Sequence, residues 1–119
     1  SRSYEPAEID FVHQNNIFMR TPLDLDTPEK IDRVVGEIFR QIDDRPYVVS
    51  FDFDAIDPNT FASVLVPEPN GISLSAARQL THAFAPDAHS FEFVEYAPHD
   101  GDAQSADIVR ELVGIALAD

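Results

Sequence analysis

The sequence predicts an α/β protein in which helices lie outside a parallel sheet, and three observations lead to this prediction. Stretches with helical periodicity alternate with short β-prone stretches along the chain. The strand predicted over residues 47–53 is apolar along nearly its whole length, as a strand covered on both faces would be. Consecutive parallel strands need a crossover connection, which the intervening helices can provide.

The clearest single element is a helix in the first half of the chain. Thr27 has the side chain of an N-cap, Pro28 suits the first helical position, and Glu29 is an acid in the first turn. Apolar residues then recur at helical spacing until the segment D-D-R-P at 43–46. The sequence therefore predicts a helix from residue 28 to about residue 42.

The remaining elements follow from the same periodicities and from proline and glycine breaks. The expected elements are a short helix at about 6–15, a short strand at 17–19, a loop at 21–26, a long loop at 54–73, a helix at about 74–84, a strand at 91–96 and a helix from 104 to about 117.

Length and composition exclude several classes of protein. A chain of 119 residues forms one domain at most. Its 22 acidic and 8 basic residues give a formal net charge of -14, which argues against binding to nucleic acid or to anionic membrane surfaces. No stretch approaches the ~20 apolar residues of a membrane span. We therefore expect a small-molecule ligand, with no nucleic-acid or membrane partner.

Cysteine usage and the amino-terminal segment indicate the compartment. The sequence has no cysteine, which excludes disulfides and thiolate metal sites. The first residues, S-R-S-Y-E-P, do not have the pattern of a signal peptide. Both observations favour a cytoplasmic location.

Two carboxylates at the end of the predicted central strand are the most informative feature. Asp52 and Asp54 are two residues apart, and alternation along a strand predicts that their side chains point the same way. Two like charges at such a distance usually bind a cation or divide acid and base roles between them. The carboxyl end of a strand is also where open α/β sheets place their ligands.

Three interpretations of this pair were weighed. The pair could be a solvated strand end, although unpaired charge next to apolar residues is costly. A calcium-binding loop starting at Asp52 fails, because its sixth position is Asp57 and its twelfth is Ser63 instead of Gly and Glu. A strand ending in D-x-D also resembles the haloacid dehalogenase family of phosphatases, with Asp52 as nucleophile and Asp54 as acid or base.

A longer pattern resembles a different family. Residues 50–58 read S-F-D-F-D-A-I-D-P, and residues 67–73 read P-E-P-N-G-I-S. Together they are similar to the signature of the ureohydrolases, the family of arginases, agmatinases and formimidoylglutamases. Residues 2–8 (R-S-Y-E-P-A-E) and 92–98 (E-F-V-E-Y-A-P) are similar to further family segments.

The resemblance implies a fold, a cofactor and site residues. Members have a three-layer α/β/α fold with a mainly parallel sheet, and a centre of two manganese ions that activates water for attack on an amidine carbon. Asp52 and Asp54 match two carboxylate ligands of that centre. Glu95 matches the acid that pairs with the guanidinium or formimino group, so it is the candidate catalytic and substrate-binding residue. Glu5 is a second candidate for substrate binding.

The sequence also departs from the family pattern. The remaining ligands lie in G-G-D-H and D-x-H-x-D motifs upstream of the matched segments, and neither motif occurs here. The four histidines of the chain, His13, His82, His89 and His99, match no ligand position. We therefore expect residues 1–119 to be the C-terminal part of one ureohydrolase domain, incomplete in fold, with the upstream half absent and the segment alone inactive.

The substrate and the assembly are left open by the sequence. Residues 64–66 (V-L-V) stand where many members have T-G-T, which argues against a standard arginase and is compatible with a formimidoylglutamase. The resemblance implies a homo-oligomer, a trimer or hexamer, and the N-terminal half of the same protein as a partner. The alternatives to a manganese ureohydrolase are the phosphatase described above and a degenerate, non-catalytic family member.

Overall fold

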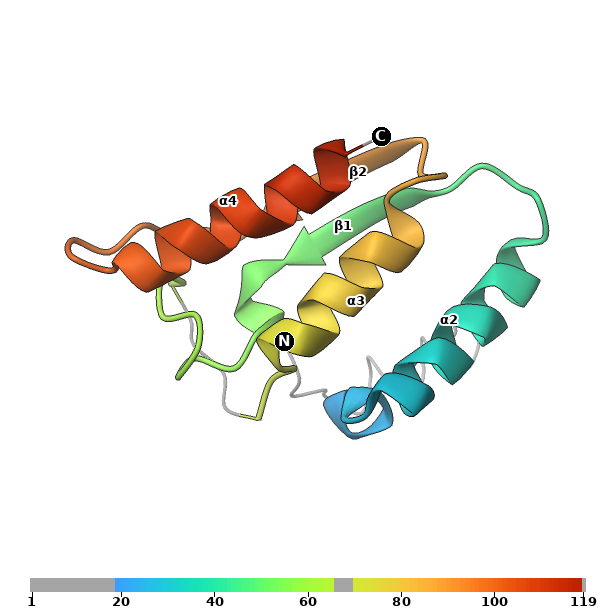
Figure 1. The fold of residues 1–119 in the computed structure, drawn as a ribbon, viewed down its shortest axis with the longest axis horizontal. Helices are drawn as coiled ribbons and strands as arrows, with labels where there is room; N and C mark the ends of the chain where they lie inside the picture. Colours follow the sequence, from blue (N-terminus) through green and yellow to red (C-terminus); the bar gives the residue numbers. More distant parts are fainter. Residues whose placement is uncertain (1–18, 66–69, 119) are drawn as a thin grey trace, which may run out of the picture.

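The computed structural model describes residues 19–65 and 70–118. Figure 1 shows the arrangement of their elements. In chain order these are η1 (Pro22–Leu25), α2 (Pro28–Ile42), β1 (Val48–Asp52), η2 (Phe53–Ala55), α3 (Leu74–Phe84), β2 (Ser90–Val94) and α4 (Ala103–Leu117), where η marks a 3-10 helix.

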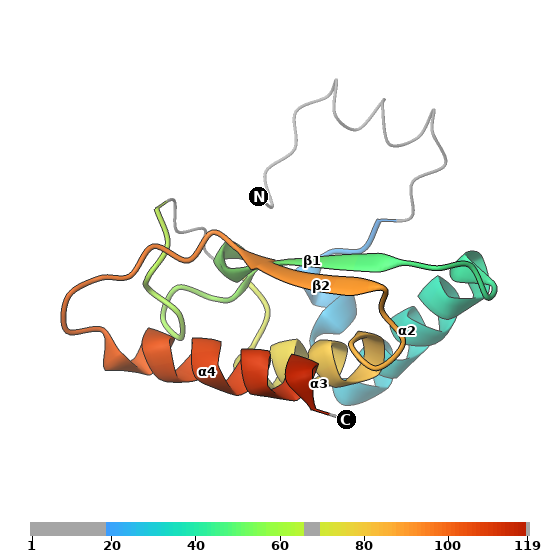
Figure 2. The ribbon, with the colours of Figure 1, turned by 90° about the horizontal axis from the view of Figure 1, so that it is seen from above.

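The strands β1 and β2 pair in parallel, and α3 lies in the connection between them. Figure 2 shows the sheet edge-on, with α2, α3 and α4 all on one of its faces. This confirms the α/β class and the parallel sheet. Within the described residues the helices form a single layer, so two of the three expected layers are present.

The helix α2 begins and ends where the sequence predicts. Thr27 has extended backbone, and its Oγ1 accepts a hydrogen bond from the Lys30 N–H at 3.2 Å, which satisfies one unpaired donor of the first turn. At the other end Asp43 adopts a left-handed conformation, with φ of 46°, and its N–H donates to the Phe39 carbonyl. Ile31 and Val34 are buried on the face toward the core.

The helices α3 and α4 are capped in the same way. Ser73 accepts from the Ala76 N–H at 3.0 Å, and Asp102 accepts from the Ser105 N–H at 3.1 Å. Capping by a short polar side chain typically contributes about 1 kcal/mol to helix stability. The first of these helices matches its predicted bounds, and α4 begins one residue before the predicted start.

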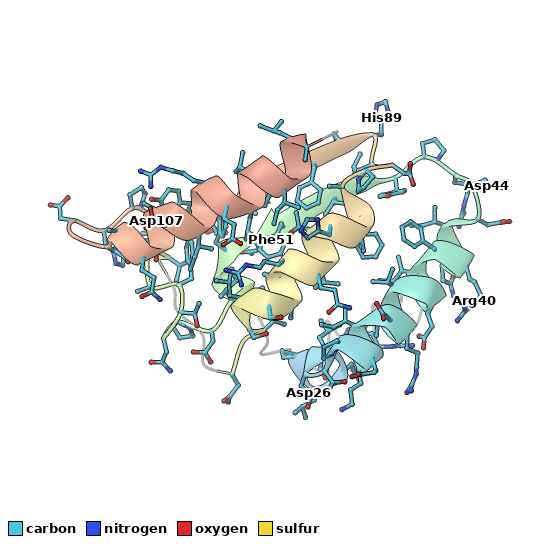
Figure 3. All side chains as sticks on the ribbon, in the orientation of Figure 1. Asp26, Arg40, Asp44, Phe51, His89 and Asp107 are labelled. Carbon is cyan, nitrogen blue, oxygen red and sulfur yellow. The ribbon has the colours of Figure 1, made fainter. Side chains whose placement is uncertain are left out.

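The aromatic core lies between the sheet and the helices. Phe53, 1% exposed, stacks on Phe61 and Phe93 with ring centroids 4.7 and 5.5 Å apart. Phe51, labelled between α3 and α4 in Figure 3, belongs to the same cluster. From the helices, the buried members are Ile31, Ala76, Ala77, Ile108 and Leu112.

The face of the sheet that points away from the helices is more exposed than the sequence predicts. The sequence predicts that the first strand is covered on both faces, but its burial alternates, and Val48 is 66% exposed. Ser50 and its register partner Glu92 are exposed as well. Because no described helix covers this face, the apolar residues there contact solvent in the described part of the chain.

Other differences concern element boundaries. The segment 21–26 was predicted as a loop but contains η1, because Pro22 follows Thr21 and Asp24 closes a capping box with it. The strands are shorter than predicted, at Val48–Asp52 and Ser90–Val94. The predicted helix at 6–15 lies outside the described residues. So does the strand at 17–19, except for Met19, which is in no strand.

Candidate functional site

The carboxyl ends of both strands lie at the same edge of the sheet. Asp52, the last residue of β1, pairs in register with Val94, the last residue of β2. Asp54 lies two residues after the end of β1, and Glu95 follows directly after the end of β2. The parallel register therefore brings the three predicted acidic residues to one edge, which is the edge where open α/β sheets bind ligands.

The Asp52 side chain has a structural task as well as a charge. It is the N-cap of η2, and its Oδ1 accepts a hydrogen bond from the Asp54 N–H at 3.0 Å. Both aspartates are half-buried. Oδ1 of Asp52 thus fixes the turn that carries Asp54, and Oδ2 can accept a further contact.

Strand alternation is the wrong reason to expect the side chains of Asp52 and Asp54 together, although both line the same pocket. Strand alternation does not reach Asp54, because β1 ends at Asp52 and residues Phe53–Ala55 form η2. The two side chains nevertheless line one pocket of about 300 Å³. Its lining residues are Arg20, Thr21, Pro22, Leu25, Ser50, Phe51, Asp52, Asp54, Ala55, Ile72 and Leu80.

A basic side chain borders the same pocket. Arg20 forms an ion pair with Glu37 of α2, with 2.5 Å between Nη2 and Oε2, and its Nη1 donates to the Met19 carbonyl. The pocket therefore has both signs of charge on its wall. Sequence reasoning did not single out Arg20, because it lies between the predicted strand at 17–19 and the predicted loop at 21–26, outside any motif.

The loop after η2 is closed by backbone contacts that require glycine. Ile72 donates to the Ala55 carbonyl at 2.9 Å, and Asp57 donates to the Ile72 carbonyl at 3.0 Å, which forms a short parallel bridge. A Cβ on Gly71 would lie 2.4 Å from the Ala55 oxygen and 2.6 Å from the Asp57 nitrogen. Asn70, directly before Gly71, has φ of 60°, in the left-handed region that asparagine tolerates.

Glu95 is exposed and has an unusual backbone. Its φ is 64°, in the left-handed region that non-glycine residues rarely adopt. Such strain persists where the flanking structure holds it, and it is concentrated at functional sites. On one flank is the paired strand, and on the other Tyr96 packs against Phe53 and Phe61, with centroid distances of 6.0 and 5.8 Å.

A buried polar network joins the two loops at this edge, and sequence reasoning missed it. Ser63 Oγ donates to Asp102 Oδ2 at 2.6 Å and accepts from the His99 N–H at 3.1 Å. Hydrogen bonds from Ser105 and Ser63 lower the pKa of the Asp102 carboxyl below its ordinary value. Asp102 is recognisable as a helix cap, but nothing near Ser63 in the sequence indicates its partner.

The other predicted candidates do not join the site in the described part of the chain. Glu5 and His13 lie outside the described residues. His89 is at the start of β2, at the far end of the sheet in Figure 3, and its N–H donates to the Tyr47 carbonyl. In residues 19–65 and 70–118 no three His, Asp or Glu side chains gather as a metal site would require. Asp52 and Asp54 are thus a partial donor set.

Comparison with known proteins identifies the family. The family model described as "Arginase family" matches residues 1–117. The chain belongs to the arginase family. This confirms the resemblance drawn from the sequence motifs, and it gives the phosphatase interpretation no support. No curated protein sequence matches the chain.

Solved structures of arginase-family enzymes share the fold. Arginase from Bacillus subtilis is 24% identical, with a TM-score of 0.87 over 100% of this chain and 44% of its own. Arginase from Entamoeba histolytica, solved with L-ornithine, is 24% identical, with a TM-score of 0.85 over 99% of this chain and 41% of its own. Formimidoylglutamase from Bacillus subtilis is 19% identical, with a TM-score of 0.84 over 98% and 38%.

These alignments define what part of the fold is present. The chain spans less than half the length of each of these three structures. It therefore has the arginase fold in part, which agrees with the single helical layer and the two-stranded sheet. Among the described residues, no helix is long and apolar enough to cross a membrane.

Proposed function

We propose that residues 1–119 form the C-terminal part of a manganese-dependent ureohydrolase that hydrolyses a C–N bond of a small guanidino or formimino compound. Membership of the arginase family supports a hydrolase of this class. The observation that carries the proposal is the pocket shared by two carboxylates, at the edge of the sheet where the register also places Glu95. Asp52 and Asp54 share one pocket, and Glu95 follows the strand end that pairs with Asp52.

The donor chemistry of the pocket fits manganese in part. Carboxylate oxygens are ligands that Mn²⁺ accepts, and Asp52 and Asp54 are the residues that would hold it. When bound, manganese supplies activation of water and polarisation of the scissile group. Two carboxylates are too few to hold such an ion tightly, so the remaining ligands are expected in sequence upstream of Ser1.

The side chains of this chain have separate tasks in the proposed reaction. Glu95 pairs with the cationic guanidinium or formimino group and orients its carbon toward the Asp52–Asp54 pocket. A charge-assisted bond of this kind is strong and, if bidentate, directional. Asp52 also fixes the turn of Asp54 through its bond to the Asp54 N–H. Because Glu95 makes its pair with the substrate in the ground state as well as in the transition state, its loss is expected mainly in KM.

The relatives indicate the chemical class of the substrate but not the compound itself. The solved relatives are named as arginases, an agmatine ureohydrolase and a formimidoylglutamase. L-arginine, agmatine and N-formimino-L-glutamate are accordingly the compounds to test. Val64 is buried and Leu65 is 78% exposed in the segment where many family members have polar residues. Neither residue lines the pocket of Asp52 and Asp54, so this departure argues only against a standard arginase and is compatible with a formimino substrate.

The proposal is tested with the longest natural polypeptide that contains this chain, loaded with manganese. We expect hydrolysis of one of the three compounds, and a loss of about 10³-fold or more in kcat for Asp52→Asn and Asp54→Asn. The matched control is Asp57→Asn. Asp57 is in the same loop, and its Oδ1 accepts from the Asn59 N–H at 2.9 Å, a bond that asparagine retains.

Two results would overturn the proposal. One is unchanged turnover in both Asp52→Asn and Asp54→Asn. The other is an absence of turnover of every compound by a manganese-loaded polypeptide, which would indicate a non-catalytic family member. Sedimentation of the same sample tests the proposed trimer or hexamer, and a monomer would contradict it.

A further inference from the structure

Ser63 is buried at the junction of the two loops that form the site. It is 1% exposed, and every polar group that it uses has a partner. Its hydroxyl donates to Asp102 and accepts from the His99 N–H, and its carbonyl accepts from the Ala97 N–H at 2.8 Å. Since a buried unpaired group costs free energy, these bonds fix residues 97–99 on Ser63.

Asp102 gives the Ser63 hydroxyl its direction. One carboxylate oxygen caps α4 by accepting from the Ser105 N–H, and the other accepts from Ser63. An ionised carboxylate only accepts hydrogen bonds, so the Ser63 proton must point to Asp102. The hydroxyl oxygen is then left to accept from the His99 N–H. Ser105 Oγ completes the junction by accepting from the Ala62 N–H at 3.1 Å.

The segment that Ser63 holds begins two residues after Glu95. The left-handed backbone of Glu95 is disfavoured, and it depends on both flanks for its conformation. The upstream flank is fixed by the pairing of Val94 with Asp52, and the downstream flank by Ser63. If the downstream flank were released, Glu95 could relax toward an ordinary extended conformation, which would redirect its side chain.

We propose that Ser63 is a positioning residue for Glu95, with Asp102 orienting its hydroxyl. Ser63 fixes residues 97–99, and this keeps the Glu95 carboxylate where it can pair with the substrate cation beside the Asp52–Asp54 pocket. The inference rests on the proposed function, because the position of Glu95 matters only if this residue binds the substrate. Neither Ser63 nor Asp102 belongs to the motifs that identify the family.

The first measurement is steady-state kinetics of Ser63→Ala in the manganese-loaded natural polypeptide. We expect KM to rise about tenfold, with kcat changed by less than about twofold, because the interaction lost is made in the ground state as well as in the transition state. The control is Thr81→Val. Thr81 is fully buried, and its hydroxyl bonds only to the Ala77 carbonyl within α3. This variant should keep the wild-type KM.

A double-mutant cycle separates positioning from a general loss of stability. If Ser63 acts through Glu95, the double variant Ser63→Ala/Glu95→Gln has the same KM as Glu95→Gln alone. Multiplication of the two KM increases would overturn the inference. An unchanged KM in Glu95→Gln would instead overturn the proposed function. A raised KM in Glu95→Gln with an unchanged KM in Ser63→Ala would overturn the positioning role only.

A milder variant covers the case in which Ser63→Ala does not fold. Asp102→Asn has one carboxamide oxygen to serve both Ser63 and the α4 cap, so one of the two bonds is weakened. We expect KM to rise about threefold and, again, no further rise when Glu95→Gln is present. A KM equal to that of the wild type would contradict the role assigned to Asp102.

Discussion

The loops that follow β1 and β2 meet at one edge of the sheet but are held by different forces. The loop after β1 is held mainly by apolar packing and by close backbone contact, through Phe53 and Gly71. The loop after β2 carries Glu95 in a strained conformation and is held by Ser63 and Asp102. The contacts that Gly71 makes in the first loop are with residues 55–57, whereas the second loop depends on Ser63, 36 residues before His99.

The largest effect on stability is expected from the aromatic anchor of the first loop. Phe53 lies between Asp52 and Asp54 and stacks in the core, so Phe53→Ala should lower the free energy of unfolding by about 3–5 kcal/mol. Phe39, half-buried against Phe84 at the other end of the sheet, is the control, and Phe39→Ala should cost less than half as much. Urea unfolding measures both, and equal losses would contradict the comparison.

The next largest effect is expected where the two ends of that loop approach each other, at residues 55–57 and Gly71. Gly71→Ala places a Cβ against backbone atoms of residues 55–57, which cannot move aside as a side chain would. We expect a loss of about 3 kcal/mol. Gly114 in α4 has open space around its Cα, so Gly114→Ala should instead raise stability by up to about 1 kcal/mol. A neutral Gly71→Ala would show that the loop is not closed as described.

The smallest effect is the acid sensitivity that Asp102 gives to the second loop. The pKa of Asp102 is lowered in the folded state, first by hydrogen bonding from Ser105 and then from Ser63. Because the folded pKa lies below the unfolded value of about 3.9, its contribution is present above that pH. It is lost as the pH falls through the folded pKa.

The measurement is the urea midpoint between pH 5 and pH 3. Asp102→Asn should flatten the fall of the midpoint over this range, since the titrating group is removed. Asp100→Asn, a change of the same charge at an exposed position in the same loop, should leave the slope as in the wild type. Identical slopes in all three proteins would argue against an ionised Asp102 in the network.

Most of the fold could be predicted from the sequence because its signals are local. The bounds of α2 follow from Thr27 and Pro28 at the start and from the break after Ile42. The alternation of helices and strands predicts the parallel sheet that is observed. The short η1 was missed, since the bond that closes it, from the Thr21 N–H to the carboxylate of Asp24, can form in a loop or in a 3-10 turn.

The sequence names candidate site residues but does not give their geometry. The motif predicts Asp52, Asp54 and Glu95, and the register of the strands places all three at one edge. The turn at Phe53–Ala55 was missed because the apolar run before it favours a strand that continues through Phe53, and nothing local indicates the left-handed backbone of Glu95. Ser63 meets Asp102 across 39 residues of sequence, and nothing in the local pattern of either residue indicates the other.

The manganese content of purified variants tests the central claim most directly. The claim is that the loop after β1 holds the metal and that the loop after β2 holds the substrate. The manganese content of each variant of the natural polypeptide is measured by elemental analysis after loosely bound ions have been removed. Asp52→Asn and Asp54→Asn should lose manganese, whereas Glu95→Gln should keep the wild-type content. Full manganese content in both aspartate variants, or its loss in Glu95→Gln, would contradict the account.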